Sequence, residues 1–205
     1  MSMKAIQCNQ FAGYEISDVG KSTSLRLRKK ILPLRKVLSL IDHAPLPDFD
    51  AVANPENVLI ETHYTGIQYP DALQAQGFYQ VRPPTPYTPG MDLSGIVIKI
   101  GKEVKSFSIG DRVMAVSTKQ GGTGSMAGVV SLPCHSVWKL PNNVPLSHCA
   151  NLGRNYFAAY HSLKILGDVK RDDLVLIDGA SGGVGMAAIE LAKAMGAKVI
   201  AGVST

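Results

Sequence analysis

The chain has 205 residues, of which 45% are hydrophobic, and its formal net charge is +5. This length and apolar content are sufficient for a buried core in one or two domains. No apolar run reaches the roughly 18 residues of a membrane-spanning helix, and residues 1–10 lack the pattern of a secretory signal. We therefore expect a cytoplasmic protein with no membrane partner.

The first predicted strand covers residues 3–11 and leads, after an interruption, into an apolar run at 37–40. Residues 13–31 between them are polar and then basic, and we predict that they form an insertion. Seven lysines and arginines lie within 21–36, but this segment has no aromatic residue to stack on a base. We interpret 21–36 as a solvated surface, with nucleic acid or an acidic partner as the alternative.

The middle of the chain is typical of an all-β fold. Runs rich in β-branched residues predict strands at 58–64, 93–100 and 111–116, and glycine and proline turns separate them. Such short and closely punctuated strands predict a compact barrel or sandwich. Cys8, Cys134 and Cys149 are widely spaced, so we expect neither a disulfide framework nor a cysteine zinc cluster.

Helical periodicity begins near Leu146, which places a predicted domain boundary after residue 145. We therefore predict a β domain over 1–145 and a second domain over 146–205. The second domain contains a strand at 174–177, a glycine-rich turn, a helix at 184–195 and a strand at 198–203. This order predicts an α/β unit with parallel strands.

The turn after the first of these strands indicates a dinucleotide site. Its N–H groups, at the N-terminus of a helix, suit a pyrophosphate. The usual G-x-G-x-x-G pattern has alanine at its first position here. The predicted cofactor-binding residues of the turn are Ala180, Ser181, Gly182, Gly183, Val184 and Gly185. A purely structural turn is the alternative.

The end of the second strand indicates which dinucleotide is bound. A carboxylate there would accept a hydrogen bond from the ribose of NAD, whereas this chain has Ser204 and Thr205. Small hydroxyl residues leave room for a 2′-phosphate and can donate hydrogen bonds to it. We therefore predict NADP(H), with Ser204 and Thr205 as cofactor-binding residues. The alternative is that both are ordinary loop residues.

Five motifs occur in the same order as in one known enzyme family, at 65–71, 76–79, 83–95, 110–113 and 179–185. The stretch 58–205 that contains them resembles the zinc-free quinone oxidoreductases of the medium-chain dehydrogenase/reductase superfamily, the zeta-crystallin-like group. The resemblance implies a GroES-like β domain followed by a Rossmann domain, with NADPH in the cleft between them. It also implies hydride transfer to a small-molecule quinone or enone.

The resemblance also implies site residues. Gln68 and Met91 stand where zinc-dependent relatives have a cysteine and a histidine ligand, so we expect no metal. Gln68 stands where family members have an asparagine near the nicotinamide. Tyr79 matches a tyrosine proposed as a proton donor in enoyl-thioester reductases, with a packing ring as the alternative. Tyr69 and Asp71 are candidates for the substrate pocket. We expect Asp71 to anchor the loop rather than to touch the substrate.

A doubly wound fold needs about six strands, and 146–205 supplies two of them. We therefore expect an incomplete Rossmann domain with unpaired strand edges, and doubtful turnover by this chain alone. The alternatives are a non-catalytic fragment that acts as a binding or regulatory module, and an enoyl-thioester reductase. The resemblance further allows a homodimer in a full-length parent.

Overall fold

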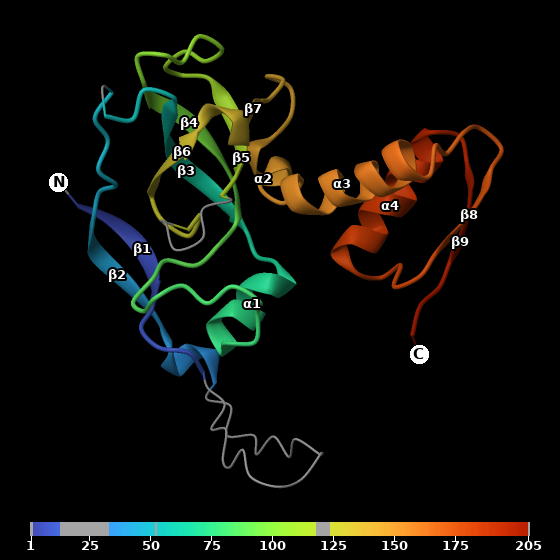
Figure 1. Cartoon of the computed structure of the whole chain (residues 1–205), viewed down its shortest axis with the longest axis horizontal. Helices are drawn as coiled ribbons and strands as arrows, with labels where there is room; N and C mark the ends of the chain where they lie inside the picture. Colours follow the sequence, from blue (N-terminus) through green and yellow to red (C-terminus); the bar gives the residue numbers. More distant parts are fainter. Residues whose placement is uncertain (1, 13–32, 52, 118–123, 205) are drawn as a thin grey trace, which may run out of the picture.

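The computed structural model describes residues 2–12, 33–51, 53–117 and 124–204. The predicted insertion at 13–31 lies outside the described residues. Figure 1 shows a β-rich lobe and a smaller α/β lobe, connected by two consecutive helices. The expected order, all-β followed by α/β, is confirmed.

The β-rich lobe is built on an antiparallel sheet in which neighbouring strands come from distant parts of the chain. Its order is β6-β3-β4-β5-β7. The strands are β3 (Asn57–Gly66), β4 (Asp92–Ile100), β5 (Arg112–Val116), β6 (Val129–Pro133) and β7 (Val137–Lys139). The core beside this sheet includes Val58, Ile60, Leu93, Val97 and Val113, all at most 1% exposed. These are the apolar residues of the predicted strands.

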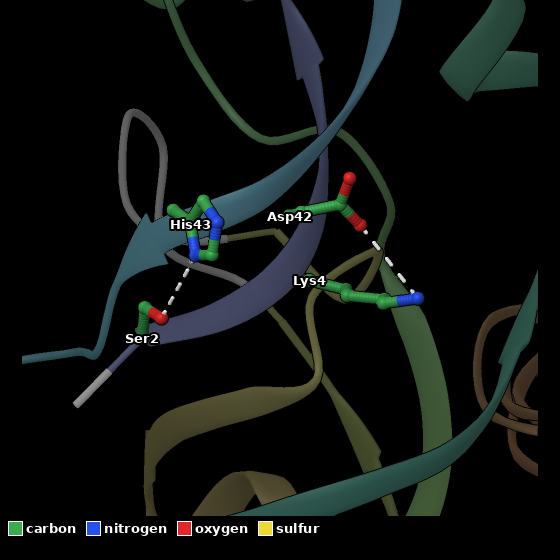
Figure 2. Close-up of polar contacts among 4 residues, drawn as sticks. All are labelled: Ser2, Lys4, Asp42 and His43. Atoms are coloured by element: carbon green, nitrogen blue, oxygen red, sulfur yellow. Dashed lines mark hydrogen bonds and ion pairs between the residues drawn. The ribbon is translucent and has the colours of Figure 1, made fainter.

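A second, two-stranded sheet pairs the N-terminal strand β1 (Ser2–Cys8) with β2 (Leu38–Pro45) in antiparallel fashion. Figure 2 shows two polar contacts on this pair: Lys4 Nζ lies 3.6 Å from Asp42, and Ser2 Oγ lies 3.3 Å from His43 Nδ1. Both contacts are exposed, so they add little to stability. The pairing places the apolar runs on either side of 13–31 side by side.

Four helices matter for the site. Helix α1 (Tyr69–Gln76) follows β3, and α2 (Leu146–Cys149), α3 (Gly153–Tyr160) and the π-helical turn η3 (His161–Leu166) follow β7. Ser94 Oγ in β4 donates to the carbonyl of Leu146 at 2.6 Å, so α2 packs on the β-rich lobe. The predicted boundary at residue 145 stays a prediction. Two short 3-10 helices, η1 (Leu34–Lys36) and η2 (Cys134–Ser136), complete the β-rich lobe.

The smaller lobe is a βαβ unit. Strands β8 (Leu174–Ile177) and β9 (Lys198–Ala201) pair in parallel, and helix α4 (Gly183–Ala194) connects them. Alanines of α4, including the fully buried Ala192, pack against α3 and the strands. Leu174, Leu176 and Ile200 are 67%, 70% and 51% exposed. Among the described strands, β8 and β9 pair only with each other, so each has an unpaired edge, as the sequence predicts. No helix among the described residues has the length and apolar character needed to cross a membrane.

Candidate functional site

A cleft of about 710 Å³ lies between the two lobes. One wall is the segment 67–70 at the start of α1, and another is the start of α3, with Asn151, Arg154 and Asn155. The third wall is the turn after β8, including 177–179 and 182–185. The volume lies within the range of small-molecule and cofactor sites. The cleft brings together the glycine-rich turn and Gln68, which the sequence placed in one site.

The turn presents free backbone donors to this cleft. Gly179 has a φ of 63°, and the N–H of Gly182 donates to the carbonyl of Gly179 at 3.0 Å. The N–H groups of Gly183, Val184 and Gly185 form the first turn of α4, and no protein acceptor is found for them in the described part of the chain. The helix has no side-chain cap. Three unpaired amides at a helix N-terminus form an anion site.

Glycine is required at the last position of the turn. A Cβ atom added at Gly185 would lie 2.3 Å from the carbonyl oxygen of Gly179 and 2.7 Å from the Cα of Ala180. Ala180 is itself buried, and its N–H donates to the carbonyl of Gly202 after β9. Close packing between the turn and α4 therefore sets the direction in which the amides point. Glycine at this position therefore allows the turn to pack closely on α4, which is one of the roles of glycine in dinucleotide-binding turns.

The wall of the β-rich lobe rests on buried carboxyl groups. Gln68 precedes α1, and its N–H donates to Asp71 Oδ2 at 2.8 Å. Its side-chain nitrogen Nε2 donates to Asp92 Oδ2 at the start of β4. Asp71 and Asp92 are 4% and 1% exposed, and Oδ1 of each has no hydrogen-bond partner in the described structure. Gln68 is thus held from both its backbone and its side chain.

Burial controls the electrostatics of this pair. Desolvation raises the pKa of Asp92 to about 6, although hydrogen bonds from Arg154 and Gln68 and the charge of Arg154 lower it. Desolvation also raises the pKa of Asp71, against the opposing hydrogen bond from the backbone of Gln68. The negative charge of Asp71 raises the pKa of Asp92 further. The two carboxyl groups that hold Gln68 are therefore costly to charge.

Two polar residues of α3 complete the cleft, and the sequence reasoning did not select them. Arg154 donates from its backbone N–H to Asp92 Oδ2 at 3.3 Å and from Nη2 to the carbonyl of Ser117 at 3.4 Å. Asn155 reaches the opposite wall, since a Cβ atom at Gly183 would lie 2.8 Å from its Nδ2. Asp178 was also missed, although it lines the cleft directly before the glycines. The available signal was the group of polar residues Asn151, Arg154 and Asn155 near the start of the helical stretch.

The other predicted site residues take different places. Tyr69 lines the cleft and is 77% exposed, whereas Asp71 lies behind Gln68 and lines a separate apolar pocket of about 310 Å³. Tyr79 is half-buried in the loop after α1 and is not among the residues that line the cleft. Ser181 is exposed beside the turn, and Ser204 is exposed after β9. Thr205 lies outside the described residues. The roles of all these residues stay predictions.

The metal prediction concerns Gln68 and Met91. Gln68 directs its amide nitrogen to Asp92, and Met91 is buried at the end of the loop before β4. Within the described ranges, no group of three or more His, Cys, Asp or Glu side chains is placed to hold a metal ion. An amide nitrogen and a thioether are weak partners for zinc. Independence from zinc stays a prediction.

Comparisons with known proteins agree with this architecture. Residues 54–142 match the alcohol dehydrogenase GroES-like domain family. Human quinone oxidoreductase is 34% identical over 199 residues, which cover 97% of this chain and 52% of that protein. The chain thus spans about half the length of the curated relatives it matches.

Solved structures show the same relationship. A human synaptic vesicle membrane protein VAT-1 homolog-like protein superimposes with a TM-score of 0.80 at 29% identity, covering all of this chain and 57% of that one. Escherichia coli quinone oxidoreductase complexed with NADPH superimposes with a TM-score of 0.75 at 26% identity, covering 98% and 53%. The similarity therefore extends over both lobes and the cleft between them.

Proposed function

Because the chain belongs to the quinone oxidoreductase-like group of the medium-chain dehydrogenase/reductase superfamily, we propose that it forms part of an NADPH-dependent reductase. In this proposal the β-rich lobe and the βαβ unit together hold the dinucleotide. The acceptor is a quinone or an activated alkene such as an enone. NADPH supplies the hydride, and the protein supplies binding, orientation and exclusion of water.

The observation that carries the proposal is the set of unpaired amides at the start of α4. Gly183, Val184 and Gly185, whose N–H groups are unpaired, line the same cleft as Gln68, which stands on the opposite lobe. A dinucleotide has a pyrophosphate in its middle and a nicotinamide at one end. An anion site on one wall and an amide side chain on another suit those two parts.

Gln68 supports the nicotinamide end of the proposal. Its Nε2 is already used by Asp92, so its Oε1 is the atom left to accept a hydrogen bond. The nicotinamide carboxamide has an NH₂ group that can donate to such an oxygen. The buried hydrogen bond to Asp92 would fix the amide in this orientation before any ligand binds, which lowers the entropic cost of binding.

The preference for NADP(H) rests on the end of β9. Ser204 is exposed there and carries a hydroxyl, where a carboxylate would repel a 2′-phosphate. The nearby Asp178 bonds to its own neighbour, with Oδ1 accepting from the N–H of Gly179 at 2.9 Å. The negative charge of Asp178 would repel a phosphate bound at the turn. We therefore expect the negative charge of Asp178 to weaken the binding of NADP(H).

The experiment is a fluorescence titration of the full gene product with NADPH and, as the matched control, NADH. Turnover is then measured with 1,4-benzoquinone and with an α,β-unsaturated ketone. We expect NADPH to bind at least tenfold more tightly than NADH and to be oxidised by one of the acceptors. A protein that binds NADPH but reduces neither acceptor would refute the proposed activity, and equal affinity for both nucleotides would refute the cofactor preference.

A further inference from the structure

Arg154 is a cation in the cleft that has no carboxylate directly against it. It forms no ion pair within 4 Å in the part of the chain that the structure describes. Nη2 donates to the carbonyl of Ser117, and Nε is buried without a partner. A guanidinium has five N–H donors, so most of its capacity is unused. The side chain is therefore available to an electronegative ligand.

The surroundings keep this cation in place. Its own backbone N–H is fixed to Asp92, and its charge acts on Asp71 and Asp92, where it lowers the pKa of both carboxyl groups. Both carboxyl groups are held by Gln68 on the wall of the β-rich lobe. The backbone of Arg154 is thus fixed, and Nη2 holds the guanidinium to the carbonyl of Ser117. A charged donor that is already positioned needs less reorganisation to bind a ligand.

The position of Arg154 also indicates which part of a bound ligand its side chain would contact. Its hydrogen bonds, to Asp92 and to Ser117, are both to the β-rich lobe. The next residue, Asn155, lies instead against Gly183 in the glycine-rich turn. Arg154 therefore belongs to the end of the cleft that contains Gln68. This is the end proposed above for the nicotinamide, away from the pyrophosphate, and the acceptor must reach the nicotinamide to receive its hydride.

We propose that Arg154 binds the carbonyl oxygen of the acceptor and stabilises the negative charge that hydride transfer places on that oxygen. This inference rests on the proposed function and adds a residue role to it. With an enone, the electron-poor carbon gains the hydride and forms a C–H bond, while NADPH is oxidised by two electrons. The C=C electron pair moves toward the carbonyl, whose oxygen becomes an enolate. The enolate then takes a proton from water or a protein acid.

A cation at the oxygen makes this step easier because the charge develops only as the hydride moves. A donor matched to developing charge contributes about 10²–10³ in rate in enzymes that use one. The same interaction should favour acceptors with a carbonyl conjugated to the reacting carbon. Alkenes activated only by an apolar aromatic group would gain nothing from Arg154. The acceptor class is thus a conjugated carbonyl compound, which includes quinones and enones.

The test uses 4-nitrophenolate as a stable mimic of the oxyanion and nitrobenzene as its neutral counterpart. Binding of each probe is measured with and without NADP⁺, and the absorbance of the phenolate reports its ionisation directly. We expect Arg154→Gln to weaken phenolate binding about tenfold to hundredfold, while nitrobenzene binding changes by less than about twofold. Arg154→Lys should retain part of the preference for the phenolate, because it keeps the charge.

Arg171→Gln is the matched control. Arg171 is exposed in the loop before β8, so this substitution removes the same charge outside the cleft. Circular dichroism melts establish that each variant is folded. An equal loss of affinity for both probes in Arg154→Gln, or an unchanged preference for the phenolate, would refute the inference. If the protein still binds NADP⁺ in that case, the proposed function is not refuted with it. A selective loss of NADP⁺ affinity in Arg154→Gln would instead make Arg154 a cofactor residue and also refute it. Failure of the wild-type protein to bind NADP⁺ would refute the proposed function itself.

Discussion

Gln68 Nε2 donates a hydrogen bond to Asp92 Oδ2, connecting the residue before α1 to the first residue of β4. Both side chains are buried, and Asp92 also accepts from the backbone of Arg154 in α3. One carboxyl group therefore joins the β-rich lobe to the helix that leads into the βαβ unit. The stability of the cleft and its chemistry depend on the same small set of polar contacts.

Replacing Gln68 with Leu should destabilise the protein, because it removes a donor from a buried carboxyl group. We expect a loss of about 1–3 kcal/mol in the free energy of unfolding, measured by urea denaturation at pH 7. Gln80→Leu is the control, since Gln80 is exposed, and it should change that free energy by less than about 0.5 kcal/mol. Equal effects of the two substitutions would contradict the role given to Gln68.

Asp92→Asn should change how stability depends on pH. Burial raises the pKa of Asp92 from 3.8 to about 6, so the folded state holds this proton more tightly than the unfolded state. Wild-type stability should therefore fall as pH rises from about 4 to about 7, and this contribution is absent in the variant. The stability of the variant relative to wild type should rise by up to about 3 kcal/mol over that window. Urea denaturation at pH 4, 5.5 and 7 measures it, and a difference independent of pH would contradict it.

Gly185→Ala should damage the glycine-rich turn, because the new Cβ would lie 2.3 Å from the carbonyl oxygen of Gly179. We expect a loss of about 1–3 kcal/mol in stability and at least tenfold weaker NADPH binding. Gly128→Ala is the matched control, since its Cβ would come no closer than 3.5 Å to its neighbours. Thermal melts and fluorescence titration measure the two effects. Unchanged NADPH affinity in a folded Gly185→Ala protein would count against the dinucleotide site.

Asp178→Asn should strengthen NADPH binding, because it removes a negative charge from the cleft beside the phosphate-binding amides. We expect the Kd to fall about threefold at low salt, and the gain to shrink at higher ionic strength. Asp48→Asn provides the same change of charge on the exposed loop after β2 and should leave the Kd unaltered. Weaker NADPH binding by Asp178→Asn would contradict this prediction and would show that the carboxylate stabilises the conformation of the turn.

Tyr79→Phe tests the predicted proton donor. If the phenol gives a proton to the reduced acceptor, its loss should lower kcat about 10²-fold and leave NADPH affinity intact. Steady-state kinetics with an enone, together with the NADPH titration, separate the two effects. Turnover that stays within twofold of wild type would assign Tyr79 to packing, in keeping with its place outside the lining of the cleft.

The sequence predicted the βαβ unit well because its signals are local. The strand at 174–177 has the predicted bounds, and α4 begins one residue before the predicted helix. An apolar run, a glycine turn and a run of small residues each act within a few positions. The same reasoning placed β3, β4 and β5 within two residues of their observed bounds.

Other elements depend on tertiary contacts. Helix α1 was not predicted, although Gln68 and Asp71 stand at the spacing of a capping box and Pro70 lies in the first turn. Its residues read as a loop because few of them are strongly apolar. Strand β7 has only three residues, and its pairing with β5 defines it. Arg154 and Asn155 form a weak polar signal in the sequence, and their place in the cleft depends on the position of α3 between the two lobes.

Adjacent residues of α3 touch opposite walls of the cleft, Arg154 on the β-rich lobe and Asn155 at the glycine-rich turn. A rigid helix turn cannot shift one of them without shifting the other. Occupancy at the phosphate end should therefore alter affinity at the acceptor end, and thermodynamic linkage requires the reverse effect to be equally large. Cooperative binding, in which each ligand changes the affinity of the cleft for the other by the same factor, follows from the adjacency of these two side chains.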